Sequence, residues 1–123
     1  MVIIDTCVLI ELLRGNKTTI EKLYEYEQKD IFVTPVVVAE LYRGARDKNE
    51  FGRCRNLIRK FSVLSINEDV IGIFDSIFEN YSISHRPTIP DMLIAATSVS
   101  YNIPLFTLNM KDFRFIPGIQ LIS

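Results

Sequence analysis

Three acidic residues are surrounded in the sequence by apolar residues, an environment that is unfavourable for an ionised carboxylate. Asp5 ends an apolar strand-like run, Glu40 lies inside an apolar helical pattern, and Asp91 begins a segment that is apolar nearly all round. Burying an isolated carboxylate is costly, so each of these groups needs a partner or a purpose. A cluster of oxygen ligands without histidine or thiolate suits Mg²⁺ or Mn²⁺ better than zinc. Such ions activate water and neutralise charge on a phosphodiester under attack.

Each of the three acids also has a simpler explanation. Asp5 could cap the helix that follows it. Asp91 could be a favourable negative charge at a helix N-terminus. Glu40 could pair with Arg43, one turn further along the same helix. The explanations are adequate one at a time, but a shared metal would account for all three acids together.

The hydrophobic pattern supplies elements that could bring these acids together. Strands are expected at 1–5, 31–33, 61–66, 104–107 and 119–122. Helices are expected at 6–14, 18–28, 35–44, 48–59, from the cap at Asn67 to Tyr81, and at 91–101, with loops at 82–90 and 108–118. This alternation predicts one α/β domain over residues 1–123, a three-layer α/β/α sandwich around a mainly parallel sheet of four to five strands. Active-site crevices form at the carboxyl ends of such strands, which is where Asp5 falls.

Composition narrows the class of protein. The chain has 123 residues, 48% of them hydrophobic, and no apolar run of the length that a membrane span requires. The first residues do not resemble a signal peptide, and two cysteines are too few for a disulfide framework, so we expect a cytoplasmic protein. Cys7 and Cys54 are interpreted as small buried hydrophobes, and His85 as a loop residue. No Walker loop, GxGxxG, GxSxG or CxxC pattern is present.

Positive charge is concentrated in one segment, although the net charge is only −1. Residues 43–60 hold seven basic groups against Asp47 and Glu50. Such a block could attract a polyanion, or it could be the solvated face of a helix. We expect Phe51, Leu57 and Ile58 to form the inward side of that helix.

Four motifs, in order along nearly the whole chain, resemble those of PIN-domain ribonucleases, close to the VapC toxins of bacterial and archaeal toxin–antitoxin pairs. They are Ile-Ile-Asp-Thr at 3–6, Val-Ala-Glu-Leu-Tyr-Arg-Gly at 38–44, Asp-Met-Leu-Ile-Ala-Ala-Thr at 91–97 and Thr-Leu-Asn-Met-Lys-Asp-Phe at 107–113. The resemblance implies an α/β/α sandwich around a parallel sheet, with an acidic pocket that binds divalent metal.

The family's three principal acids fall on Asp5, Glu40 and Asp91. The resemblance implies that Asp5 and Asp91 bind metal directly and that Glu40 is a ligand or orients metal-bound water. It also implies that Thr6 and Thr107 hydrogen-bond ligands or substrate.

The family's fourth acidic position is Asn109 in this chain. An amide oxygen can coordinate Mg²⁺ or hold a water but adds no negative charge, so a second metal is expected to bind weakly or only with substrate phosphate. Asp112, three residues further on, either compensates for this departure or is a structural loop residue.

The leading hypothesis is therefore a Mg²⁺- or Mn²⁺-dependent endoribonuclease that hydrolyses RNA by metal-activated water and leaves a 5′-phosphate. The basic segment would guide the RNA, with Arg43, Arg46, Arg86 and Lys111 as candidate phosphate contacts. The resemblance further implies a small antitoxin, docked across the first two helices, and a homodimer.

Two rival hypotheses come from other classes. A PIN fold that has lost catalysis and binds RNA or protein is favoured by Asn109 and disfavoured by the three retained acids. A metal phosphatase or phospho-acceptor domain also places an aspartate after its first strand. Against those, position 7 is cysteine rather than a second aspartate, and residues 104–107 contain no lysine.

Overall fold

A single parallel sheet forms the centre of the computed structural model, which describes residues 1–123. Its strands are β1 (Val2–Ile4), β2 (Ile31–Val33), β3 (Ser62–Val63), β4 (Leu105–Phe106) and β5 (Leu121–Ile122). Their order across the sheet is β3-β2-β1-β4-β5, and every neighbouring pair is parallel. The central strand β1 is flanked on both sides and is fully buried, which explains its uninterrupted apolar sequence.

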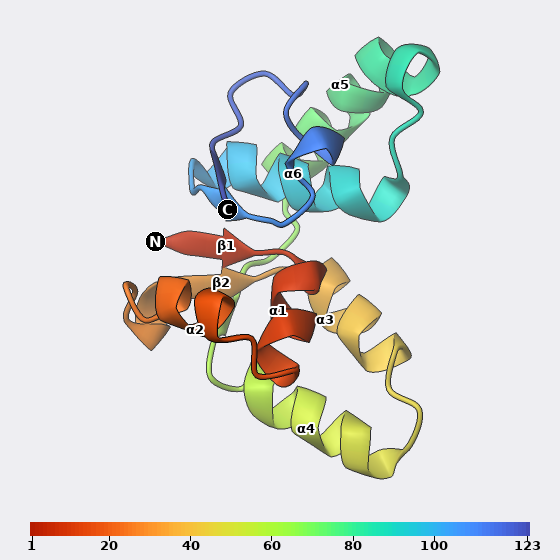
Figure 1. Cartoon of the computed structure of the whole chain (residues 1–123). Coiled ribbons are helices and arrows are strands. Elements are labelled where there is room, and N and C mark those ends of the chain that lie inside the picture. The colour runs from red at the N-terminus through yellow and green to blue at the C-terminus, as the bar shows by residue number, and fades with distance from the viewer.

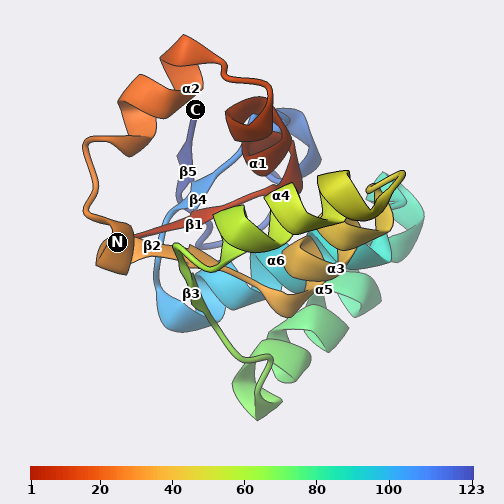
Figure 2. The same ribbon diagram turned by 90° about the horizontal axis from the view of Figure 1, so that it is seen from below.

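Helices cover both faces of this sheet. They are α1 (Thr6–Leu13), α2 (Lys17–Leu23), α3 (Pro35–Arg43), α4 (Lys48–Ile58), α5 (Glu68–His85) and α6 (Ile89–Tyr101). The first four lie on one side and α5 and α6 on the other (Figure 1), and the view from below places α1, α2 and α4 in front of the sheet (Figure 2). The predicted three-layer α/β/α sandwich is confirmed, with five strands that are all parallel.

Side-chain caps begin the helices where the sequence predicts them. Asn67 accepts a hydrogen bond from the backbone N–H of Val70 at the start of α5. Thr34 does the same for Val37 of α3, with Pro35 in the first helical position. Such caps satisfy N–H groups that have no partner within the helix, so they fix where each helix starts.

The segment 82–90 was expected to be a loop, and this expectation is wrong at both ends. Helix α5 continues to His85, and α6 begins at Ile89 rather than Asp91. Polar residues do not break a helix, whereas Pro87 disfavours the helical conformation for the residue before it, so α5 ends at His85 and Arg86 caps it. Thr88 caps α6 by accepting from the N–H of Asp91, with a proline in the first turn.

Several other boundaries are narrower than expected. The third strand pairs only through Ser62 and Val63, and helix α2 stops at Leu23.

On α4, the expected inward side is only partly correct. Ile58 is buried and Leu57 is partly buried, but Phe51 is exposed and packs its ring beside Tyr42 instead of facing the core. No helix combines the length and apolar character that crossing a membrane requires.

Helix α6 contributes many residues to the core. Ala95 and Ala96 are fully buried, as are Met92 and Ile94 on the same helix. Asp91 lies in the first turn of this helix, close enough to Asp5 for the charge of that carboxylate to act on it.

Candidate metal-dependent nuclease site

The pairing of β1 with β4 creates the centre of the site. Ile4 lies opposite Phe106, so the residues that follow them, Asp5 and Thr107, meet at the carboxyl edge of the sheet. The hydroxyl of Thr107 donates to Oδ2 of Asp5 at 2.8 Å, although 102 positions separate the two residues. Thr107 is fully buried and Asp5 is 5% exposed.

Asp5 acts as a helix cap and a site residue at the same time. Its Oδ1 accepts from the backbone N–H of Thr6 at 2.8 Å and so caps α1. Its Oδ2 faces the other way, toward Thr107. The capping explanation for Asp5 is therefore correct, but it accounts for only one of the two carboxylate oxygens.

Glu40 is exposed, so the expectation that it is buried in an apolar helix is wrong. It occupies a solvent-facing position of α3, and its Oε1 accepts from the hydroxyl of Thr6 at 2.9 Å. The alternative pairing with Arg43 does not occur, because neither residue takes part in an ion pair. Thr6 thus connects the beginning of α1 to the carboxylate of Glu40.

Asp91 is partly buried in the first turn of α6 and has an unfavourable electrostatic environment. Burial raises the pKa of its carboxyl group above the ordinary 3.8, and the negative charges of Asp5, Asp112 and Glu40 raise the pKa further. Only the contact with Thr88 opposes this effect. Three other carboxylates therefore act on Asp91, and no cation of the chain relieves it.

Asn109 and Asp112 lie on the loop after β4. Asn109 is exposed, and its backbone N–H donates to the hydroxyl of Thr107 at 3.1 Å. Asp112 ends the short 3₁₀ helix η2 (Met110–Asp112) and lines the same small pocket as Asp91. Asp112 thus adds negative charge beside Asp91, on the loop that carries Asn109.

Cys7 lies within this site, whereas the sequence indicated only a small buried hydrophobic residue at this position. It is half-buried, and its Sγ lies 3.5 Å from Oδ2 of Asp5 and 3.8 Å from the hydroxyl oxygen of Thr107. The backbone N–H of Leu108 donates to the same sulfur at 3.4 Å. Burial and the charge of Asp5 raise the thiol pKa, so Cys7 stays neutral beside the carboxylate. Cys54, by contrast, is buried as expected.

The donor set fits a hard divalent cation. Asp5, Glu40 and Asp91 offer only oxygen atoms, and their mutual repulsion is what a cation would relieve. No group of three or more carboxylate, thiol or imidazole side chains lies close enough together to form a ready-made metal cage. The arrangement is thus an electronegative site whose ligands would have to draw closer around an ion.

The four candidate RNA contacts occupy two different places. Arg46 is held by Glu50 through hydrogen bonds of 2.9 and 3.1 Å at the start of α4, while Arg43 is exposed near the end of α3. Arg86 and Lys111 line the small pocket beside Asp91. Arg86 and Lys111 thus share a pocket with Asp91 and Asp112, whereas Arg46 shares the larger pocket with Glu40.

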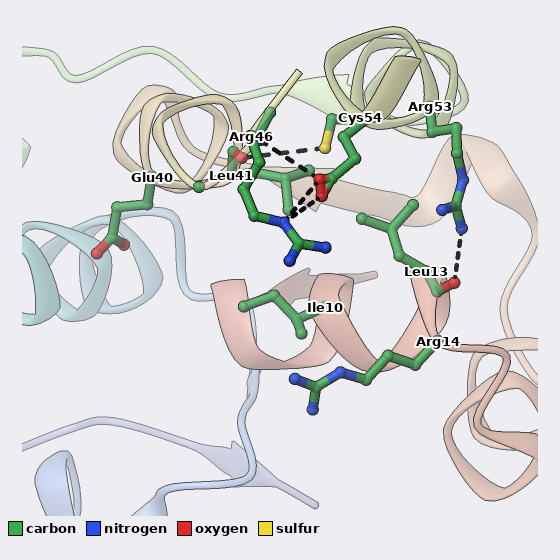
Figure 3. A pocket seen from close by; sticks show the side chains of 11 residues that line it. Ile10, Leu13, Arg14, Glu40, Leu41, Arg46, Arg53 and Cys54 are labelled. Atoms are coloured by element: carbon green, nitrogen blue, oxygen red, sulfur yellow. Dashed lines mark hydrogen bonds and ion pairs between the residues drawn. The ribbon is translucent and has the colours of Figure 1, made fainter. Parts of the chain in front are cut away.

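A larger pocket of about 350 Å³ lies between α1, α3 and α4 (Figure 3). Ile10, Leu13, Leu41 and Cys54 supply its apolar surface, and Glu40 stands at one end. Arg53 crosses from α4 to donate to the carbonyl of Leu13 at 3.0 Å. The pocket is therefore an apolar depression bordered by arginines that already have partners.

Comparison with known proteins places this chain in a family. The family model described as "PIN domain" matches residues 2–117. A curated "Ribonuclease VapC" from Rickettsia bellii is 33% identical, covering 98% of this chain and 94% of the relative. A "Ribonuclease VapC19" from Mycobacterium tuberculosis is 28% identical, with 98% of both chains covered.

Solved structures share the fold. One chain of VapBC2 from Rickettsia felis, bound to a promoter DNA fragment, matches with a TM-score of 0.88 at 18% identity, covering 99% of this chain and 98% of that one. VapBC-1 from nontypeable Haemophilus influenzae matches with a TM-score of 0.85 at 22% identity, covering 100% and 98%.

Proposed function

This chain belongs to the PIN-domain family, and we propose on that basis that it is a divalent-metal-dependent endoribonuclease, the toxin of a toxin–antitoxin pair. The observation that carries the proposal is the convergence of Asp5, Glu40 and Asp112 on the partly buried Asp91, whose pKa their negative charges raise. A site of this kind attracts a cation and, through the cation, a phosphodiester. The whole of residues 1–123 would act as one catalytic domain.

Each residue of the site has a distinct role in this proposal. Asp5 and Asp91 would hold the ion, with Glu40 as a further ligand or as the acceptor that orients the attacking water. Thr107 and Thr6 fix the carboxylates of Asp5 and Glu40 through the hydrogen bonds described above. Such partners of ligands restrict their rotation, which raises the fraction of molecules ready to bind.

Divalent-metal dependence is general in this family, and the all-oxygen donor set favours Mg²⁺ or Mn²⁺. When bound, the ion would activate water and neutralise charge on the phosphate under attack. Asn109 can contribute an amide oxygen and Asp112 a carboxylate on the side of Asp91. The basic residues Arg43 and Arg46 would contact RNA phosphates further from the cleavage point.

A protein partner is the second part of the proposal. The structural relatives are toxin–antitoxin complexes, including one from Klebsiella pneumoniae. On this chain, the apolar pocket beside Glu40 and a second apolar pocket of about 250 Å³, lined by Leu12, Ile20, Leu23 and other residues, lie among the helices on one side of the sheet. These surfaces suit an antitoxin segment that presents apolar side chains, and a homodimer of toxins would carry two such segments.

The cleavage test uses cellular RNA incubated with the purified chain and Mg²⁺ or Mn²⁺. The wild-type protein should release fragments with 5′-phosphates, and Asp5→Asn should release none while its circular dichroism spectrum stays unchanged. Lys29→Ala, just before the amino end of β2, is the control and should cleave normally. Cleavage by purified Asp5→Asn at the wild-type rate would refute the assignment.

Metal titration distinguishes the nuclease from the alternative, an inert PIN module that only binds RNA or protein. The active enzyme should show a saturable Mn²⁺ site that Asp5→Asn weakens strongly. An inert module should bind Mn²⁺ equally weakly with and without that substitution.

The partner is tested by co-expression with the neighbouring gene product. A stable complex that co-purifies and relieves toxicity supports the toxin role. Absence of both would refute this half of the proposal and leave the nuclease half intact.

A further inference from the structure

A small polar pocket opens beside Asp91, on the side of the sheet covered by α5 and α6. Its volume is about 180 Å³, and only one of its eight lining residues is hydrophobic. The side chains that matter here are those of His85, Arg86, Asp91, Lys111, Asp112 and Phe115. The pocket therefore begins at the carboxylates of the site and continues toward the end of α5.

Two cations of this pocket are available to an external anion. Arg86 and Lys111 are exposed and form no ion pair within the chain. Arg14 and Arg46, which border the larger pocket on the opposite face, are both held by glutamates. A free arginine and a free lysine next to metal-binding carboxylates are suited to a phosphate group.

An aromatic pair forms one end of the pocket. The His85 and Phe115 rings are stacked, with centroids 4.2 Å apart and an angle of 19°. The Tyr81 ring contacts both of them edge-on, at 5.5 and 5.2 Å. His85 is exposed, so Phe115 and Tyr81 support its ring while the remaining surface stays open. A rigid, supported ring is a platform on which an unpaired base can stack.

Arg86 adopts an unfavourable backbone conformation at this place. Its φ and ψ are both 49°, in the left-handed region, where a long side chain is disfavoured. The other non-glycine residue with positive φ is Asn102, a residue type that tolerates this region. Glycine would fit the end of α5 better than arginine, so the choice of arginine indicates a use for its side chain.

We propose that this pocket binds one nucleotide of the RNA, next to the phosphate that is cleaved. Arg86 and Lys111 contact the phosphate of that nucleotide, and its base stacks on His85. The inference rests on the proposed nuclease function and requires an unpaired nucleotide at this position, because a base in a duplex must first be unpaired and unstacked before it can stack on a protein ring.

Binding is measured without cleavage, using the Asp5→Asn protein and a fluorescein-labelled single-stranded oligoribonucleotide of mixed sequence. Arg86→Gly should weaken binding about three- to tenfold at low salt and lower the slope of log K against log salt by about 0.7, the value for one lost phosphate contact. The same variant should be at least as heat-stable as its parent, because glycine relieves the backbone. A purely structural role for Arg86 predicts no change in the salt slope.

Two controls match this variant. Asn102→Gly makes the same backbone change at the end of α6, and Lys29→Ala removes one positive charge just before the amino end of β2. Both should bind the oligoribonucleotide like the parent protein. Equal weakening by Lys29→Ala would show a general charge effect and overturn the assignment of Arg86.

The stacking role has its own test. His85→Ala should weaken binding at least about fivefold, and His85→Phe should restore it, because any flat ring can stack on a base. A duplex of the same sequence should bind independently of residue 85. If His85→Phe binds as weakly as His85→Ala, the ring is not a stacking platform.

The outcomes separate this inference from the function on which it rests. RNA cleavage by the wild-type chain together with undiminished binding by Arg86→Gly and His85→Ala overturns the pocket assignment alone. Lack of any RNA cleavage refutes the nuclease function and this inference with it. Weaker binding of the co-expressed partner protein, with RNA binding unchanged, assigns the pocket to that partner and also overturns the inference.

Discussion

Replacement of Thr107 by valine tests whether the buried hydrogen bond to Asp5 holds the site together. Valine has nearly the shape of threonine, so the change removes the 2.8 Å bond to Oδ2 of Asp5 without opening a cavity. A hydrogen bond to a charged group contributes about 1.5–3 kcal/mol. Both partners are buried, and the N–H of Asn109 also loses its acceptor, so we expect a loss of about 2–3 kcal/mol in the free energy of unfolding.

For a chain of this size, 1 kcal/mol corresponds to about 3–6 °C in melting temperature, so Tm should fall by about 6–18 °C. The assay is urea and thermal unfolding in EDTA, where no bound metal contributes to stability. Mn²⁺ affinity should also fall, by about 10–100-fold, because Thr107 orients the carboxylate of Asp5. Thr107→Ser keeps the hydroxyl and should recover most of both losses.

Thr97→Val is the matched control. Thr97 is equally buried, and its hydroxyl donates to the neutral carbonyl of Leu93 at 2.8 Å. A bond to a neutral helix carbonyl contributes about 1 kcal/mol or less, and the control should leave Mn²⁺ affinity unchanged. If Thr107→Val lowers the free energy of unfolding and the Mn²⁺ affinity no more than Thr97→Val does, Thr107 has no special function in holding Asp5.

Two further predictions concern the electrostatics of the site. Because burial and neighbouring acids raise the pKa of Asp91, its ionised form destabilises the folded chain, and the folded state takes up a proton before the unfolded state as pH falls. Metal-free Asp91→Asn should therefore be more stable than the wild type at pH 7 by unfolding in EDTA. The difference should shrink as pH falls through the raised pKa toward 3.8; a constant difference would contradict the electrostatic explanation. The Cys7 thiol, whose pKa burial and Asp5 raise, should react with iodoacetamide more slowly than the same thiol in urea. In a Cys54→Ala background, Asp5→Asn should speed that reaction, and an unchanged rate would exclude an effect of Asp5.

Local rules in the sequence determined most of the elements and the principal site residues. The apolar strand before Asp5, the cap and proline at Thr34 and Pro35, and the cap at Asn67 act within a few residues of chain, so they can be recognised without a fold. The pair Thr88 and Pro90 carries the same kind of start signal, and Pro87 the stop before it. The sequence thus contained the information about the ends of α5 and α6, although loop-like composition obscured it.

The exposure of individual side chains was decided by tertiary structure. Residues on an apolar helix look alike in sequence, but only the packing of α3 shows that Glu40 faces solvent and is held by Thr6. In the same way, Phe51 fits an inward position by spacing, yet it packs beside Tyr42 on the outside. Burial depends on neighbours from other elements, which a local pattern does not contain.

The sequence determined some features of the site, and the tertiary structure determined the others. The sequence by itself identified Asp5, Glu40 and Asp91 as carboxylates that needed a shared purpose. Only the sheet order decided that β4 lies against β1, because parallel strands are joined through long crossovers and their pairing is not encoded locally. That pairing places Thr107 and the segment after it beside Asp5 and Cys7, and so converts separate polar residues into one electronegative site.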